Sequence, residues 1–287
     1  MSERADLIDE RRKQIQEWEQ RLRARMSKIK HKIAVISGKG GVGKSTVTVN
    51  LAVAFAMHGY ANRVGVLDAD IHGPSVPKML GLNGQRLQVG PPGVFPVSGP
   101  LGIKVVSMDF LLPDENVPVI WRGPLKMTAI RQLLSDIVWG ELDLLLIDLP
   151  PGTGDESISV AQLLPEMDGV IIVTIPSKVS QIVVKKAVTF ARKLGMPIIG
   201  VIENMSGFVC PNCGAKVDIF QSGGGIRIAE ELEMPFLGSI PIDQKICEDS
   251  DKGIPFIAEH ADSPASKAFM EIVQKIEQKL EQKEQTK

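Results

Sequence analysis

The strongest structural pattern in the sequence is Ile33-Ala34-Val35-Ile36-Ser37-Gly38-Lys39-Gly40-Gly41-Val42-Gly43-Lys44-Ser45. Its apolar first part predicts a short buried strand. A glycine-rich loop follows, with Lys44 and Ser45 at the spacing of a phosphate-binding loop, and a helix is expected from Ser45 to Met57. Strand, loop and helix in this order are the context in which such a pattern predicts nucleotide binding.

The glycines of this loop explain how it would hold phosphate. They let successive backbone N–H groups point at phosphate oxygens, and the helix N-terminus adds partial positive charge. Lys44 is expected to bridge the terminal phosphates of ATP, and the Ser45 hydroxyl to bind Mg²⁺. The predicted nucleotide-binding residues are Gly38, Lys39, Gly40, Gly41, Val42, Gly43, Lys44, Ser45 and Thr46.

Strand-like and helix-like segments alternate through the rest of the chain, which predicts an α/β fold with a mostly parallel sheet covered by helices on both faces. The expected strands are 33–37, 63–67, 103–107, 144–147, 170–175, 198–202 and 236–240. The further expected helices are 125–138, 157–164, 180–194 and 225–233. Ligand-binding loops should then follow the carboxyl ends of the strands.

Two tails are expected to flank one ATPase domain at residues 32–262. Residues 1–31 carry apolar residues at heptad spacing, which predicts an amphipathic helix: the stripe is Ile8, Ile15, Leu22 and Ile29, with Trp18 beside it. The basic cluster from Arg21 to Lys32 is more typical of a solvated face than of a nucleic-acid site. Residues 263–287 predict a C-terminal helix that begins at Ser263-Pro264 and ends in a polar tail.

The overall composition favours a globular cytoplasmic protein. Of the 287 residues 44% are hydrophobic and 23% are charged, with a net charge of −1, so no charge-driven partner such as nucleic acid is indicated. No apolar run is long enough to span a bilayer, and the charged N-terminus does not resemble a signal peptide. Three cysteines are too few for a disulfide scaffold.

Two acidic motifs lie at expected strand ends. Asp148 ends an apolar strand within residues 143–155, where a carboxylate holds the Mg²⁺ hydration shell in P-loop proteins, and Gly152 follows in a turn that can sense the terminal phosphate. Asp68 and Asp70 follow another strand. For these two, activation of water and simple helix capping are equally good interpretations.

Cys210 and Cys213 form a single Cys-x-x-Cys, Cys210-Pro211-Asn212-Cys213. Tetrahedral zinc and [4Fe-4S] clusters both take four sulfur ligands, and the third cysteine, Cys247, is distant in sequence. A two-fold homodimer would supply the second pair. Cys247 itself is expected to be a buried thiol without a role in the site.

Together these motifs resemble one family. The extra Lys39 in the phosphate loop is similar to the deviant loop of the nitrogenase iron-protein and MinD class. With Asp68–Ser75, Asp148–Asp155, Glu203–Ser206 and the cysteine pair, residues 32–256 resemble the Mrp (ApbC) family of iron-sulfur cluster carrier ATPases. That resemblance implies a slow ATPase, a homodimer, and a [4Fe-4S] cluster bridged between subunits and passed to apoproteins.

The resemblance also assigns roles. It implies that Lys39 reaches into the partner's nucleotide site, that Asp70 positions water, that Asp148 is linked to Mg²⁺ and that Asn204 contacts adenine. Long bacterial members carry an extra N-terminal domain and eukaryotic relatives an N-terminal four-cysteine cluster, whereas this chain has a tail without cysteine. One cluster per dimer is therefore expected.

Three alternatives remain at this point. A structural zinc shared by two chains uses the same thiolates. A MinD-like membrane protein or ParA-like DNA-positioning ATPase shares the phosphate loop, but the last residues, 281–287, lack an apolar stripe and the charge predicts no DNA-binding face. A redox dithiol is the third, and it is disfavoured because the motif does not open a thioredoxin-like helix.

Overall fold

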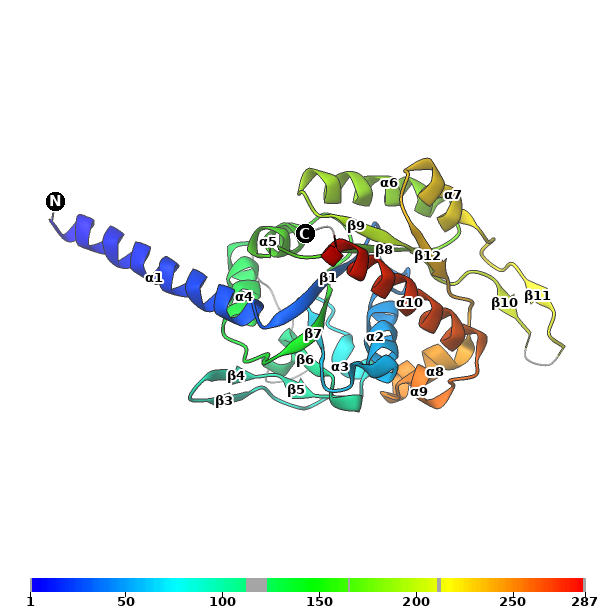
Figure 1. Ribbon diagram of the computed structural model, residues 1–287, viewed down its shortest axis with the longest axis horizontal. Coiled ribbons are helices and arrows are strands. Elements are labelled where there is room, and N and C mark those ends of the chain that lie inside the picture. Colours follow the sequence, from blue (N-terminus) through cyan, green and yellow to red (C-terminus); the bar gives the residue numbers. More distant parts are fainter. Residues whose placement is uncertain (1, 112–122, 165, 211–212, 286–287) are drawn as a thin grey trace.

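The computed structural model describes residues 2–111, 123–164, 166–210 and 213–285. Its centre is an eight-stranded sheet in the order β12-β9-β8-β1-β7-β2-β6-β5 (Figure 1). Neighbouring strands pair in parallel except for β5 and β6, so the predicted mostly parallel sheet is confirmed. The strands are β1 (Ile29–Ser37), β2 (Val64–Asp68), β5 (Val97–Ser98), β6 (Lys104–Ser107), β7 (Leu142–Asp148), β8 (Gly169–Thr174), β9 (Ile198–Glu203) and β12 (Phe236–Ser239).

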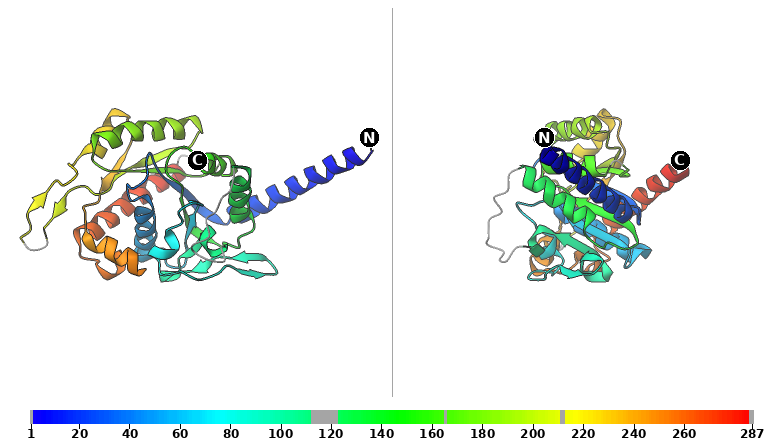
Figure 2. Two further views of the ribbon diagram at one scale, coloured as in Figure 1. Left: turned by 180° about the vertical axis from the view of Figure 1, so that it is seen from behind. Right: turned by 90° about the vertical axis from the view of Figure 1, so that its left-hand side faces the viewer.

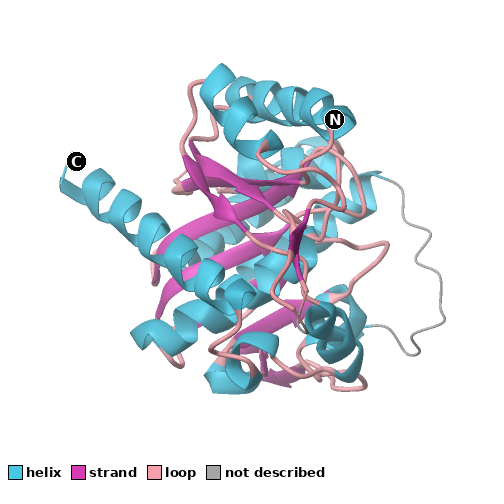
Figure 3. Ribbon diagram, turned by 90° about the vertical axis from the view of Figure 1, so that its right-hand side faces the viewer, coloured by secondary structure: helices cyan, strands magenta, loops and turns pink. Residues whose placement is uncertain are grey.

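Helices cover both faces of this sheet, as Figure 3 shows from one end. One hydrophobic core lies under α2 (Lys44–Phe55), α3 (Val76–Met79), α9 (Phe256–Glu259) and α10 (Pro264–Gln285). The other lies under α4 (Gly123–Ser135), α5 (Asp155–Leu163), α6 (Lys178–Lys193), α7 (Gly224–Glu231) and the end of α1 (Ser2–Met26). A π-helical turn, Ala56–Tyr60, continues α2, and α8 (Gln244–Lys252) packs against α3 and α9.

Smaller elements complete the chain. Two hairpins stand apart from the main sheet, β3 (Gln88–Gly90) with β4 (Gly93–Phe95), and β10 (Phe208–Val209) with β11 (Lys216–Val217). Short 3-10 turns occupy Pro100–Gly102 and Met108–Leu111. No helix in the described ranges is long and apolar enough to cross a membrane.

The strand register brings the polar strand ends to one edge. Val35 of β1 lies opposite Asp148 of β7, and Asp148 lies opposite Asp68 of β2. On the other side of β1, Thr174 of β8 lies opposite Glu203 of β9. Because all these strands run parallel, their carboxyl ends meet around the loop that follows β1.

The N-terminal tail differs from the prediction at its boundary. The helix α1 ends at Met26, and Ile29 belongs to β1, where it pairs with Leu142. Among the stripe residues whose burial is described, Leu22 is buried and Ile15 is 47% exposed. Trp18 packs partly against the body, and its Nε1 donates to the Ser135 hydroxyl at 2.8 Å. Figure 2 shows the first half of α1 projecting away from the sheet.

The C-terminal helix begins at Pro264, as predicted, and runs to Gln285. Its apolar side enters the same core as α2, with Phe269 and Ile276 fully buried. The helix is therefore packed as part of the sheet's covering layer.

Candidate functional site

The phosphate loop takes its shape from glycine conformations. Gly41 and Gly43 have φ angles of 78° and 79°, in the left-handed region that other residues rarely adopt, and Gly43 directly precedes α2. Gly38 lies so close to α6 that an added Cβ would meet Val183 at 2.6 Å. These positions require glycine, and they leave the backbone N–H groups of the loop at the start of a twelve-residue helix.

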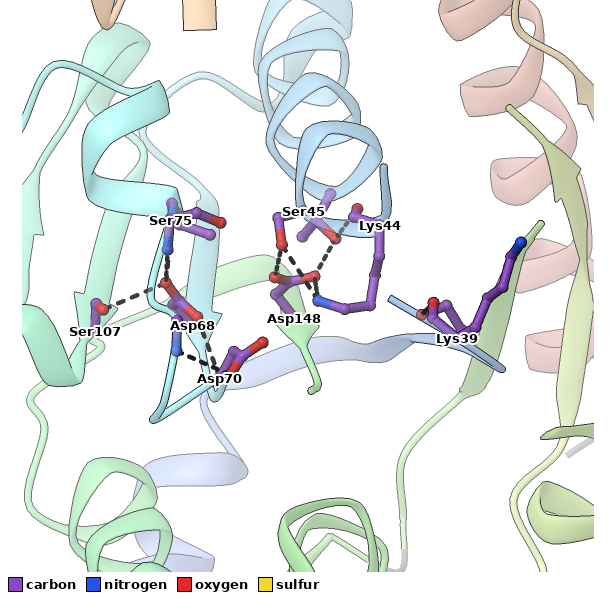
Figure 4. Close-up of polar contacts among 12 residues, drawn as sticks. Lys39, Lys44, Ser45, Asp68, Asp70, Ser75, Ser107 and Asp148 are labelled. Carbon is purple, nitrogen blue, oxygen red and sulfur yellow. Dashed lines mark hydrogen bonds and ion pairs between the residues drawn. The ribbon is translucent and has the colours of Figure 1, made fainter. Parts of the chain in front are cut away.

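Lys44, Ser45 and Asp148 meet at the start of that helix (Figure 4). Lys44 Nζ lies 2.6 Å from Asp148 Oδ1, and Ser45 Oγ donates to Asp148 Oδ2 at 2.6 Å. Lys44 is 6% exposed and Asp148 is fully buried. A buried carboxylate of this kind is stable only with charge or hydrogen-bond partners, and Lys44 and Ser45 supply both.

Thr48 also lies in the site, although no motif in the sequence predicts it. It lies one turn after Lys44, and its hydroxyl donates to Asp148 Oδ1 at 2.8 Å. The i, i+4 spacing from Lys44 places both on one side of α2 and was the available signal. Thr48 also donates to the Lys44 carbonyl at 3.0 Å, so it fixes Asp148 relative to the helix start.

The donor set around Asp148 suits Mg²⁺. A serine hydroxyl and a carboxylate, both oxygen ligands, lie within hydrogen-bond distance of each other at the mouth of the phosphate loop. The same pair holds Mg²⁺ in P-loop nucleotide sites. The residues present therefore fit Mg²⁺ together with a nucleotide phosphate.

Asp68 has the surroundings of a loop anchor. Its carboxylate accepts hydrogen bonds from the backbone N–H groups of Asp70, Ser75 and Val76 and from the Ser107 hydroxyl. Burial, and then the charge of Asp148, raise the pKa of Asp68 to about 8 against the opposing effects of Lys44 and the backbone N–H groups. Of the two interpretations, capping describes Asp68 as the structure places it.

Asp70 is half-buried and accepts from the backbone N–H of Gly73 at 3.2 Å. It lies on the Asp68 side of Asp148 and is not joined to the Lys44 group by the contacts drawn in Figure 4. Its expected role with water remains a prediction.

The side chains of Lys39 and Asn204 point in different directions relative to the phosphate loop. The Lys39 side chain is half-buried and points away from Lys44 and Asp148 (Figure 4). Asn204 is 7% exposed, follows β9, and donates from Nδ2 to the Val42 carbonyl at 2.9 Å. Asn204 thus contacts the phosphate loop itself, whereas Lys39 leads away from the site of its own chain.

The two cysteines lie on a separate hairpin, within residues 206–223, which we call the cysteine arm. Cys210 follows β10, and its backbone N–H donates to the Ala215 carbonyl at 2.9 Å while its carbonyl accepts from Gly214 at 2.9 Å. Cys213 is exposed, and neither thiol is in a disulfide. The arm extends from the end of the body opposite α1 (Figure 1).

Cys247 differs from the prediction. It lies on α8 and is exposed, not buried, because its side chain falls on the outer side of a helix whose buried residue is Asp249. Within the described ranges no group of three or more His, Cys, Asp or Glu residues is arranged to hold a metal ion. The cysteine pair is thus separate from the other cysteine and from the acidic strand ends.

A family model matches residues 28–277 of this chain, and its description is ParA, NUBPL iron-transfer P-loop NTPase. The chain belongs to this family. The ParA-family match spans the sheet, the phosphate loop and the cysteine arm together.

Relatives agree with this assignment. The iron-sulfur cluster carrier protein of Methanocaldococcus jannaschii is 56% identical over 274 residues, which cover 96% of this chain and 93% of the relative. The protein of the same name from Saccharolobus solfataricus is 54% identical and covers 92% and 88%. The predicted resemblance to iron-sulfur cluster carrier P-loop NTPases is confirmed.

Solved structures confirm the P-loop NTPase fold. A nucleotide-binding protein of Archaeoglobus fulgidus in complex with ADP is 41% identical, with a TM-score of 0.76 over 88% of this chain and 96% of that one. The cell-division ATPase MinD of Pyrococcus furiosus, 24% identical, has a TM-score of 0.62 over 87% and 99% and shares the fold.

Proposed function

We propose that this ParA-family chain is a homodimeric ATPase that carries a [4Fe-4S] cluster between two subunits and passes it to apoproteins. The observation that supports this most directly is the pair of thiols three residues apart on the projecting arm. A [4Fe-4S] cluster takes four thiolates, so two arms related by a two-fold axis supply one complete set.

The nucleotide chemistry would be carried by the buried group at the start of α2. Lys44 would pair with the terminal phosphates of ATP, and Ser45 and Asp148 would hold Mg²⁺, which neutralises phosphate charge when bound. Thr48 keeps the carboxylate oriented toward Ser45 and Lys44. Asp70 would orient the attacking water, and Asn204, fixed to the Val42 carbonyl, would contact the adenine. Turnover is expected to be slow, because switch ATPases use the phosphate to hold a conformation.

Exposure of the thiols suits a carrier. Cys213 is exposed and Cys210 is half-buried, so a cluster bound between two arms would remain accessible to an acceptor protein. A structural zinc at the same thiols is the competing possibility, since sulfur ligands alone do not separate the two. The acceptor proteins are apo iron-sulfur proteins as a class.

The test is anaerobic reconstitution with iron and sulfide, followed by the electronic spectrum and chemical assay. About four iron and four sulfide per dimer, lost to an apo-acceptor on incubation, are expected. Stoichiometric zinc that stays with the protein, with no transfer, would overturn the carrier function.

Mixing subunits of two variants tests whether each nucleotide site uses residues from both chains of a dimer. If Lys39 serves the partner's site and Asp70 its own, a Lys39→Ala subunit paired with an Asp70→Ala subunit contains one intact site and one doubly altered site. Each variant alone should hydrolyse ATP poorly, and equimolar mixing should restore about a quarter of parental turnover, since half the dimers are mixed and each has one working site. If Lys39 serves its own chain, mixing restores nothing.

A further inference from the structure

The cysteine arm leaves and rejoins the body within a small space. It starts just after Glu203, the last residue of β9, and it returns at Gly223, which precedes α7. Residues 206 and 223 both bond Glu203 at the end of β9, although they are seventeen positions apart in the chain. A residue that holds the end of β9 in place therefore also positions the base of the arm.

Glu203 holds both ends of the arm. Its Oε1 accepts from the Ser206 hydroxyl and, at 2.9 Å, from the backbone N–H of Gly223. Its Oε2 accepts from the backbone N–H of Gly225, in the first turn of α7. The side chain is fully buried, and the partial positive charge of the α7 N-terminus compensates its carboxylate.

The next residue contacts the phosphate loop. Asn204 donates to the Val42 carbonyl, and its own backbone N–H donates to Thr174 of β8 at 2.7 Å. It lies so close to the loop that a Cβ on Gly43 would be 2.3 Å from Asn204 Nδ2. Gly43 directly precedes Lys44, so the Asn204 side chain lies against the part of the loop that would bind phosphate.

Two backbone hydrogen bonds also hold the base of the arm. Ser206 N–H donates to the Ile240 carbonyl, and Ile242 N–H donates to the Gly207 carbonyl. Both tie the arm to the segment after β12. Glu203 and Asn204 are adjacent in the chain, and the side chain of Glu203 contacts the arm while that of Asn204 contacts the loop.

We propose that Glu203 is a positioning residue that couples the phosphate loop to the cysteine arm. Its neighbour Asn204 is hydrogen-bonded to the loop backbone. Its own carboxylate binds Ser206, Gly223 and Gly225 and so sets the position of the thiols. The coupling rests on the proposed function, in which one chain uses both sites. Its consequence is that bound nucleotide changes the reactivity of Cys210 and Cys213.

The experiment measures thiol labelling in apo, reduced, full-length protein. In a Cys247→Ser background, Ellman's reagent reports only Cys210 and Cys213, without nucleotide, with Mg·ADP and with a non-hydrolysable Mg·ATP analogue. The parent rate should change at least about fivefold between the nucleotide states, the range of ordinary coupling between sites. In Glu203→Gln the change should fall below about twofold, while calorimetric affinity for the nucleotide stays within about twofold of the parent.

A milder pair of variants guards against misfolding of Glu203→Gln. Ser206→Ala removes one bond to Glu203, and Ser222→Ala removes a serine hydroxyl of the same arm that bonds Asp218 instead. Ser206→Ala should reduce the nucleotide response and Ser222→Ala should keep it. A parent without a nucleotide response, or equal responses in these two variants and the parent, would overturn the coupling.

These outcomes separate the coupling from the carrier function. Protein that takes up and delivers a cluster but labels identically in all nucleotide states keeps its proposed function and loses the coupling. Protein whose thiols respond to nucleotide through Glu203 but which never binds iron and sulfide loses the carrier function and keeps the coupling.

Discussion

The phosphate loop and the cysteine arm differ in whether the side chains of the site are buried and held by one another within one chain. At the loop, Lys44 and Asp148 are almost completely buried, and Asp148 lies 2.6 Å from both Lys44 Nζ and Ser45 Oγ. On the arm, two short strands carry Cys213 in an exposed position. The side chains at the start of α2 are therefore fixed by contacts within one chain, whereas the two thiols lie on a surface that a second chain can reach.

The largest expected effect is at the arm. Cys210→Ala or Cys213→Ala leaves one thiolate per chain, so cluster content should fall from about four iron per dimer to background, while ATP affinity stays unchanged. Iron and sulfide assays measure the cluster content, and calorimetry with ATP measures the nucleotide affinity. Cys247→Ala is the matched control, since it alters an exposed thiol on α8 and should retain the full cluster. Equal losses in all three variants would contradict the assignment.

The next effect is at the loop. Lys44→Ala removes the main side-chain charge from the terminal phosphates and leaves buried Asp148 without its cation. ATP turnover should fall at least about a hundredfold, the cost of losing one such stabilising group, and the unfolding free energy should fall by about 3–5 kcal/mol, as for other broken buried pairs.

The control for Lys44 is Lys185, whose ion pair with Glu231 is solvent-exposed. Lys185→Ala should change the unfolding free energy by less than about 1 kcal/mol. Urea denaturation followed by circular dichroism measures both variants. A Lys44→Ala protein as stable as Lys185→Ala would show that the buried pair does not stabilise the loop.

Gly43 in the phosphate loop and Gly214 in the cysteine arm have similar backbone angles, so substituting each of them compares the two regions directly. Gly43 has φ 79° and Gly214 has φ 71°, but only at Gly43 would a Cβ be crowded, by Asn204. Substitution by alanine costs about 1–2 kcal/mol at either position for the left-handed backbone, and at Gly43 crowding adds about 1–3 kcal/mol. Gly43→Ala should therefore also weaken ATP binding. The comparison fails if Gly214→Ala proves as destabilising as Gly43→Ala in thermal unfolding.

The smallest expected effect concerns Asp168, which directly precedes β8 at the amino-terminal ends of the strands, away from the phosphate loop and the cysteine arm. Burial alone would raise the pKa of Asp168, but hydrogen bonds from the His31 side chain and the Lys32 backbone N–H and the charge of Lys283 lower it to about 2. Because the folded pKa is depressed, this stabilisation is complete above about pH 4, the ordinary range of an aspartate, and is lost as the pH falls toward about 2.

Asp168→Asn should therefore cost about 1–2 kcal/mol at pH 7, allowing for solvent screening. The difference from the parent should shrink as the pH falls from about 4 toward 2, and Ellman labelling of the arm should not change. Urea titrations at several pH values measure it. A constant difference across that range would falsify the ion-pair explanation.

Much of the fold was predictable because its signals are local. The apolar runs and glycines that flank residues 33–45 define a strand, a loop and a helix without reference to distant residues, and the structure places β1 and α2 there. Parallel pairing followed from the alternation of strands and helices. Lys44, Ser45 and Asp148 were expected at one site and lie in contact.

Other features needed the assembled sheet. Ile29 fits the heptad stripe of α1, yet pairing with Leu142 makes it part of β1. Thr48 joins the site only because β7 brings Asp148, a hundred positions away, to the start of α2. Cys247 is exposed because α8 turns it outward, which a single thiol in a sequence does not reveal.

The chemical groups of this protein can be read from its sequence: a phosphate loop whose glycines allow its turns, carboxylates at strand ends, and one pair of closely spaced thiols. Which of these groups lie in contact depends on the folded chain. Strand order places β9 beside β8, so that Asn204 contacts the phosphate loop and Glu203 holds both ends of the cysteine arm. Local backbone preferences act over a few residues, whereas hydrogen bonds between distant segments form only after the sheet has brought those segments together.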